Sequence, residues 1–187
     1  MTRLLLSTAL ALAATPALAA DRYVLDASHS QIVFSYNHLG YSTGFGMFSG
    51  FDGEILWDKA NPAASSVTVA FPASSMLTGW PARFEHFMSA DFFGGRDAVR
   101  FASTGIEVTG ETTARITGDL TLNGVTAPVT LDARLNSAGM HPLENKEWAG
   151  FDATVTLSRT AFNLGAYAPF IGDEVALQIS IEAMKAE

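Results

Sequence analysis

The sequence of 187 residues contains no cysteine. This absence excludes disulfide bonds, thiolate metal sites and cysteine nucleophiles. It also excludes a lipid anchor attached to a cysteine at a signal-peptide cleavage site. The stability of the fold must therefore come from burial, and a chain of this length can form one substantial core.

Basic residues are also scarce, because 11 Lys and Arg stand against 19 Asp and Glu and give a formal net charge of −8. Phosphate backbones would repel such a chain, so the composition argues against a nucleic-acid partner. The same charge disfavours tight electrostatic binding to an anionic membrane surface.

The apolar run at residues 4–14 is only 11 residues long, too short for a stable membrane anchor. Arg3 precedes it, and the small-x-small sequence Ala17-Leu18-Ala19 follows. These features are typical of a secretory signal peptide. We predict a signal peptide at residues 1–19, cleaved after Ala19 or Ala20, and one mature domain at residues 20–187.

Most of the mature sequence alternates between apolar and polar residues, as expected of strands with one buried face. The pattern is clear at residues 31–39 and 114–135, where Asn123-Gly124 predicts a tight hairpin. About eight or nine strands joined by short turns predict an all-β fold, a closed antiparallel barrel with room for a small ligand. The glycine-rich stretch 40–53 predicts bulges or tight bends.

Alternation alone does not show whether the apolar face lines the interior or faces lipid, as in an outer-membrane barrel. Several candidate strands are near six residues, shorter than the roughly 9–11 that a tilted membrane strand needs. The chain also ends in a polar tail at residues 184–187. We favour an apolar interior and keep the membrane barrel as an alternative.

One stretch, residues 83–93, departs from the strand pattern. Phe84, Phe87, Met88 and Phe92 recur at a spacing that places them on one face of a helix. We predict one short amphipathic α-helix, inserted between strands, whose apolar face covers the mouth or flank of the barrel. It either plugs the core or also walls a ligand cavity.

Catalytic and metal-binding signatures are weak. Adjacent residues in Ser28-His29-Ser30 are expected to point in different directions, and no G-x-S-x-G elbow is present. No pair of histidines has H-x-H or H-x-x-x-H spacing. We therefore predict that the protein is not an enzyme and has no metal site. By contrast, 13 Phe, 4 Tyr and 3 Trp suit an apolar pocket for a lipophilic ligand.

Several motifs in series resemble those of the YceI-like family. They include Tyr23-x-Leu25-Asp26-x-x-His29-Ser30, His38-x-Gly40, His86-x-x-Ser89-Ala90-Asp91-Phe92-Phe93, Gly118-x-Leu120-Thr121-Leu122-x-Gly124 and Gly172-Asp173-x-Val175-x-Leu177. The likeness covers the whole mature chain. Residues 75–86 depart from the family pattern, because Phe84-Glu85 replaces an Arg-Asp pair, so the resemblance does not carry a headgroup preference.

The resemblance implies a lipocalin-like barrel in the periplasm that binds a polyisoprenoid or a similar long-chain amphiphile. Some relatives are associated with b-type cytochromes, so an isoprenoid quinone is a candidate ligand and a membrane b-type cytochrome a candidate partner. No covalent cofactor is expected. A stress-response or respiratory partner protein without carrier activity is the alternative, and monomer and homodimer both remain open.

We predict ligand-binding residues of two kinds. Those of the apolar wall are Phe34, Tyr36, Phe48, Phe84, Phe87, Phe92 and Phe93. Those that make polar contacts with a headgroup are His38, Arg83 and His86. Arg159 is a further candidate headgroup partner.

Overall fold

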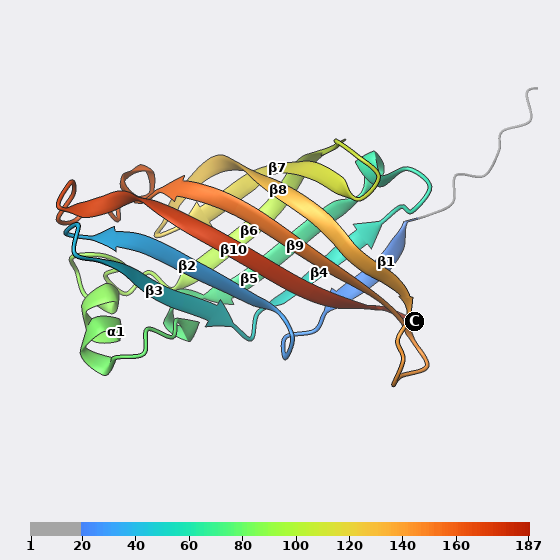
Figure 1. Cartoon of the computed structure of the whole chain (residues 1–187), viewed down its shortest axis with the longest axis horizontal. Coiled ribbons are helices and arrows are strands. Elements are labelled where there is room, and N and C mark those ends of the chain that lie inside the picture. Colours follow the sequence, from blue (N-terminus) through green and yellow to red (C-terminus); the bar gives the residue numbers. More distant parts are fainter. Residues whose placement is uncertain (1–19) are drawn as a thin grey trace, which may run out of the picture.

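The computed structural model describes residues 20–187, so the predicted signal peptide lies outside the described residues. Ten strands, one α-helix and three short 3-10 helices make up the described chain (Figure 1). The strands are β1 (Asp21–Leu25), β2 (Gln31–His38), β3 (Ser42–Ser49), β4 (Asp52–Trp57), β5 (Ser66–Pro72), β6 (Ala98–Val108), β7 (Thr113–Leu122), β8 (Val125–Met140), β9 (Glu147–Ser158) and β10 (Ile171–Lys185). The helices are α1 (Pro81–Met88), η1 (Pro62–Ala64), η2 (Ala73–Ser75) and η3 (Arg159–Phe162).

Eight of the strands close into an antiparallel barrel, which confirms the predicted fold class. The order runs β1-β4-β5-β6-β7-β8-β9-β10, and β10 pairs back with β1. Strand β10 is long enough to pair with two strands along one edge. Residues 183–185 pair with β1, and residues 171–180 pair with β2. The β2–β3 hairpin therefore extends the barrel wall beyond β1.

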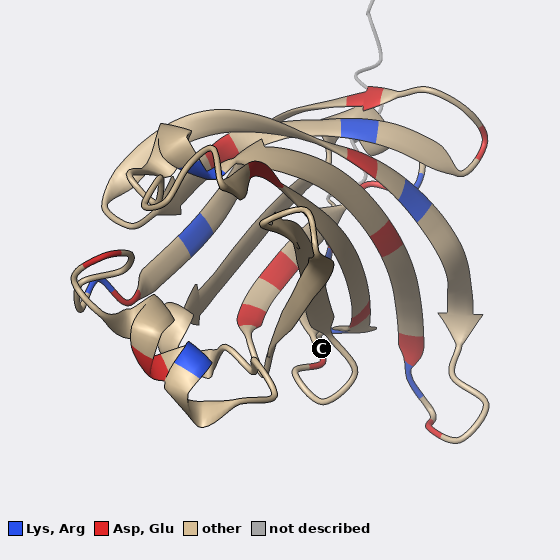
Figure 2. Cartoon of the chain, turned by 60° about the vertical axis from the view of Figure 1, so that its left-hand side comes forward, with Lys and Arg blue, Asp and Glu red and all other residues tan. Residues whose placement is uncertain are grey.

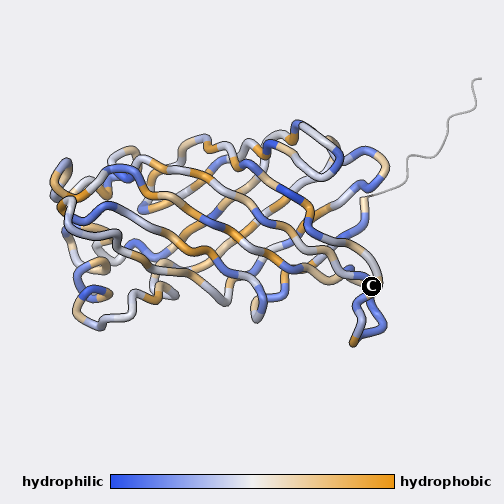
Figure 3. Tube along the Cα trace, in the orientation of Figure 1, coloured by the Kyte–Doolittle hydropathy of each residue, from blue (hydrophilic) through white to orange (hydrophobic). Residues whose placement is uncertain are grey.

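The inner face of the barrel is apolar and the outer face is polar, as the favoured alternative predicted. On β7, Ile116 and Leu120 point inward, whereas Arg115, Thr117 and Asp119 are exposed. Figure 3 shows the alternation of hydropathy along the crossing strands. A lipid-facing barrel would have the reverse arrangement. Strands β1, β4 and β5 have five to seven residues, as expected of several strands, whereas β6 to β10 are 10–16 residues long. Among residues 20–187, no helix is both long and apolar enough to cross a membrane.

The glycines of β3 do not form the predicted bulges. Strand β3 pairs with β2 in continuous register, and Gly46 lies opposite Phe34. A Cβ atom at Gly46 would overlap the Phe34 ring, and one at Gly44 would overlap the Tyr36 ring. These two positions therefore need glycine because aromatic rings lie flat against the backbone, not because the strand bends. A tight turn does occur at Gly50, with φ +70°.

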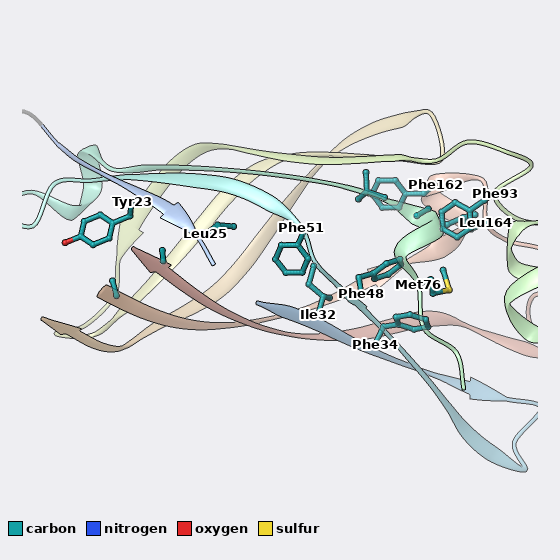
Figure 4. Close-up of a cluster of buried hydrophobic side chains, with 14 residues drawn as sticks. Tyr23, Leu25, Ile32, Phe34, Phe48, Phe51, Met76, Phe93, Phe162 and Leu164 are labelled. Atoms are coloured by element: carbon teal, nitrogen blue, oxygen red, sulfur yellow. The ribbon is translucent and has the colours of Figure 1, made fainter. Parts of the chain in front are cut away.

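The buried core is concentrated where the β2–β3 hairpin, η2 and η3 pack against the barrel (Figure 4). Phe48 and Phe71 lie with ring centroids 5.1 Å apart, and Phe51 packs against Phe71 at 5.4 Å. The bridge between Met47 and Leu77 ties the edge of β3 to the segment before α1. This core fixes the position of the hairpin relative to the helix.

The predicted helix is present but shorter than expected. It begins at Pro81, a residue favoured in the first turn of a helix, and ends at Met88. Phe92 lies beyond the helix, in the following turns, yet its ring remains 5.5 Å from that of Phe87. In Figure 1, α1 lies at the same end of the barrel as the tip of the β2–β3 hairpin, opposite the C-terminus.

Candidate functional site

Two cavities meet end to end inside the protein. The mouth cavity, about 570 Å³, lies among the β2–β3 hairpin, α1 and the loop of residues 163–170, which we call the mouth loop. The barrel cavity, about 280 Å³, continues between strands β4 to β10. Four side chains line both cavities, and we call them the waist: Phe48, Leu122, Leu157 and Leu177. The two cavities therefore adjoin at the waist, and we refer to them together as the hollow.

The wall of the barrel cavity is apolar and loosely covered. Ile116, Leu131 and Val155 point inward from β7, β8 and β9, yet each is only half-buried. Side chains in a packed interior would be fully covered by their neighbours. Their residual exposure is therefore exposure to the hollow. Polar groups line this cavity mainly toward the β6–β7 turn, where Glu111 and Thr112 lie.

The mouth cavity is apolar with a few cationic or donor groups. Arg83, Arg159, His38 and His86 line it, and none of the described residues in its lining is Asp or Glu. Such a lining suits a ligand whose polar end carries hydrogen-bond acceptors. The hollow as a whole thus offers a donor-bearing outer compartment and an apolar inner one.

Arg159 holds the mouth loop in place. Its guanidinium is buried and donates hydrogen bonds to the carbonyl oxygens of Leu164, Ala166 (2.8 Å), Ile171 (2.7 Å) and Gly172 (2.8 Å). Burial lowers the pKa of Arg159 from its ordinary value. The sequence marked this arginine as a candidate for a ligand headgroup, but most of its donors are committed to the backbone.

Asp173 supports the same region from the start of β10. The Ser158 hydroxyl donates to its carboxylate at 2.6 Å, and the Thr160 N–H and hydroxyl donate at 2.9 Å and 3.0 Å. These bonds, that of Ser158 foremost, hold the pKa of Asp173 below its usual range. The ionised carboxylate therefore anchors η3, which leads into the mouth loop.

A polar contact joins the mouth loop to the turn after α1. The Tyr167 hydroxyl donates to Asp91 at 2.9 Å, and His86 Nε2 lies 3.3 Å from the same carboxylate. The hydrogen bond to Asp91 raises the pKa of Tyr167. The His86 ring also lies 5.2 Å from that of Phe92. These contacts bridge the two sides of the mouth.

Nine of the ten predicted ligand-binding residues line the mouth cavity, where the structure brings them together. They are Phe34, Tyr36, His38, Phe48, Arg83, His86, Phe87, Phe92 and Phe93. Phe84 packs against the hydrophobic core and lies outside both cavity linings. Contact of the nine with a ligand stays a prediction.

The ligand-binding residues predicted from the sequence do not include the wall of the barrel cavity. Ile116, Leu131 and Val155 belong to alternating strands, and that alternation could have marked them as inward-facing. It could not show whether the space between them is filled. The residues of the mouth loop that line the cavity, Leu164 and Tyr167, were visible only as part of an aromatic loop.

The Ser28-His29 pair lies in the turn between β1 and β2, outside the lining of the mouth cavity. Contrary to expectation, the Ser28 hydroxyl does reach His29, at 3.1 Å from Nδ1. Asp26 contacts the same nitrogen at 2.5 Å. A catalytic triad needs the serine and the acid on different ring nitrogens. Asp26, His29 and Glu182 also lie within 4.8 Å of one another, but Asp26 and His29 already satisfy each other as an ion pair.

A family model described as the YceI-like domain matches residues 23–183. A UPF0312 protein of Pseudomonas putida strain W619 is 40% identical over 186 residues, which cover 97% of this chain and 95% of the relative. A UPF0312 protein of Pseudomonas savastanoi pv. phaseolicola is 39% identical over the same shares of the two chains.

Solved structures show the same fold. Burkholderia cenocepacia BcnA superposes with a TM-score of 0.76 and 21% identity, over 84% of this chain and 98% of its own. The Campylobacter jejuni YceI protein gives a TM-score of 0.71 and 25% identity, over 81% and 90%. A polyisoprenoid binding domain from Saccharophagus degradans gives 0.68 and 13%, over 88% and 98%.

Proposed function

Because this chain belongs to the YceI-like family, we propose that it is a periplasmic carrier for a polyisoprenoid, such as an isoprenoid quinone, or for a similar long-chain amphiphile. The single observation that carries the proposal is the two-compartment hollow with its shared waist. Its apolar inner compartment suits a hydrocarbon tail, and its donor-bearing mouth suits a headgroup with acceptor oxygens. The polyisoprenoid-binding neighbour with the same fold supports this ligand class.

Binding rather than catalysis is the role that the site supports. Two of the polar groups of the mouth are already engaged, Arg159 with backbone carbonyls and His86 with Asp91. A lipid of this kind gains about 0.8 kcal/mol for each buried methylene, so a few isoprene units offset the cost of ordering the chain. The function therefore needs a hollow and not a reactive group.

The periplasmic location rests on the leader-like sequence at residues 1–19, which contains no cysteine for a lipid anchor. An exported carrier would protect a water-insoluble lipid while it crosses an aqueous compartment. A membrane b-type cytochrome stays a candidate partner for a quinone-loaded form. Both a monomer and a homodimer are compatible with this role.

Native mass spectrometry of the protein isolated from the periplasm tests the proposal. We expect a mass increment that matches one isoprenoid lipid, its loss after organic extraction, and its recovery on incubation with an isoprenoid quinone. A palmitate-loaded sample serves as the control for generic apolar binding. A protein that is empty on isolation, and that takes up no quinone after extraction, would refute carriage.

A further inference from the structure

Exposed aromatic side chains gather around the opening of the mouth cavity. All five that are prominently exposed in residues 20–187 lie there, and we call them the aromatic rim: Tyr41 (91% exposed), Phe45 (59%), Trp80 (63%), Tyr167 (53%) and Phe170 (74%). Phe45 and Tyr167 themselves line the cavity. Exposed apolar groups scattered singly need no explanation, but a contiguous set around an opening marks an interaction surface.

The backbone holds two of these rings out in solvent. Leu39 and Gly40 have φ of 58° and 74°, and the Tyr41 N–H donates to the His38 carbonyl at 3.0 Å, which fixes the tip of the β2–β3 hairpin. The Thr78 hydroxyl donates to the Trp80 carbonyl at 2.9 Å, which fixes the backbone at Trp80. The exposure of these rings is therefore built into hydrogen-bonded turns.

The mouth loop is held in the same way. The Ile171 N–H donates to the Tyr167 carbonyl at 2.9 Å, and the Ala168 N–H donates to the Gly165 carbonyl at 3.1 Å. Phe170 lies between these anchors and next to Ile171, which pairs with His38 at the hairpin tip. The two sides of the rim are thus joined, and a flat partner could contact both at once.

Charge is distributed unevenly between the mouth and the rest of the protein. The segments that form the mouth, residues 31–51, 71–97, 122–128 and 157–177, contain three basic and five acidic residues. The remaining described residues contain seven basic and fourteen acidic residues, so they carry most of the net charge. In Figure 2 the acidic positions, in red, are spread along the strands of the barrel body.

We infer that the aromatic rim docks the mouth on the surface of a phospholipid bilayer, where the cavity can receive or release its lipid. This inference rests on the proposed function for its purpose. Tyr and Trp rings favour the interfacial layer of a membrane, where their apolar bodies and polar tips are both satisfied. The uncharged side chains of the rim suit that layer. An anionic surface repels the acidic body, so the body faces away from the membrane and the mouth faces toward it.

Quenching of Trp80 fluorescence by vesicles of brominated phosphatidylcholine tests the docking. Trp57 and Trp148, the other tryptophans, are partly buried, so Trp80 reports on the rim. We expect quenching that increases with vesicle concentration and is lost in Trp80→Phe. Weakening at low salt when phosphatidylglycerol is added, and recovery as salt screens the acidic body, would agree with the charge distribution.

The decisive variant is Tyr41→Ser combined with Phe170→Ser. Both side chains are exposed and neither lines a cavity, so the fold and the hollow stay intact. Each ring removed should weaken vesicle binding about tenfold, and the double variant about a hundredfold. Leu143→Ser is the matched control, because Leu143 is 89% exposed on the loop between β8 and β9, at the opposite end.

Binding of farnesol in solution without vesicles separates the docking surface from the proposed function. Farnesol bound equally by wild type and the double variant, with vesicle binding lost only in the variant, supports the inference. Absence of Trp80 quenching overturns it, as does a change of sedimentation in the double variant that reveals a dimer formed through the rim. Vesicle binding without farnesol binding supports docking and refutes the isoprenoid ligand.

Discussion

A phenylalanine placed inside the barrel cavity should block the lipid tail without unfolding the protein. Ala153 points inward from β9, and its cross-strand neighbour on β8 is Ala133, another small side chain in the cavity wall. A phenyl ring fits a cavity of about 150 Å³. In Ala153→Phe the ring should therefore occupy roughly half of the barrel cavity of about 280 Å³.

The effect on stability separates a hollow from a packed core. An extra ring forced into a packed interior costs about 1–3 kcal/mol. A ring that enters a hollow meets apolar walls and gains up to about 2 kcal/mol from its own burial. Urea unfolding of Ala153→Phe should therefore give a free energy of unfolding equal to or above that of the wild type.

The effect on binding should depend on chain length. A ring of this size displaces about one isoprene unit of five carbons, worth up to about 4 kcal/mol at about 0.8 kcal/mol per carbon. Long-chain quinone binding should then fall by as much as about a thousandfold. Farnesol, which fits in the mouth cavity alone, should bind as before. Titration calorimetry with both ligands measures the difference.

Thr154→Phe provides the matched control, because it adds the same ring one residue further along β9, on the exposed outer face. It should leave binding of both ligands unchanged. If Ala153→Phe binds the long-chain quinone as tightly as the wild type does, the tail does not enter the barrel cavity. If it unfolds the protein, the interior is packed and the reasoning from the hollow fails.

Three further changes test how the mouth is built. Arg159→Met leaves four backbone carbonyls unpaired and should cost more than about 3 kcal/mol. Faster hydrogen exchange in the mouth loop of this variant would show the loss of stability, and unchanged exchange would contradict the prediction. Gly46→Ala sets a methyl group against the buried Phe34 ring and should cost about 1–3 kcal/mol, whereas Gly105→Ala, with nothing within 4 Å, should be neutral in the same urea titration. Because the folded-state pKa of Asp173 is lowered, its contribution is complete above its unfolded pKa of about 4 and is lost as the pH falls through the folded value. Asp173→Asn should flatten the acid limb of the stability–pH curve, and an unaltered limb would assign that limb to other groups.

The second half of the barrel was predictable from sequence because its rules are local. Asn123 and Gly124, with φ of 51° and 76°, form the hairpin turn that their sequence predicts. Alternation across β7 and β8 then fixes the register on either side. Glycine in β3 was ambiguous, since a bend and a ring stacked on the backbone both require it. Only the partner strand, which places Phe34 opposite Gly46, separates the two.

The candidate site was predictable only in part, because its parts come from distant segments. The spacing in residues 83–93 predicts a helix with aromatic and polar side chains, and most of these side chains line the mouth cavity. The role of Arg159 depends on the carbonyls of a loop that the chain forms only after η3. A lone arginine in a sequence gives no sign of whether it meets carbonyls, solvent or a ligand headgroup.

The two halves of the chain contribute differently to the buried core and to the wall of the barrel cavity. Most buried core residues, such as Tyr23, Phe48 and Phe51, come from the first half and its loops. Inward-facing residues of β7 to β9, such as Ile116 and Val155, stay half-buried around the hollow. Both halves alternate with the same period, so periodicity cannot distinguish them. The difference follows from geometry, since closure of the barrel holds the walls of the second half apart, while the β2–β3 hairpin and the helix supply the aromatic rings that fill the space elsewhere.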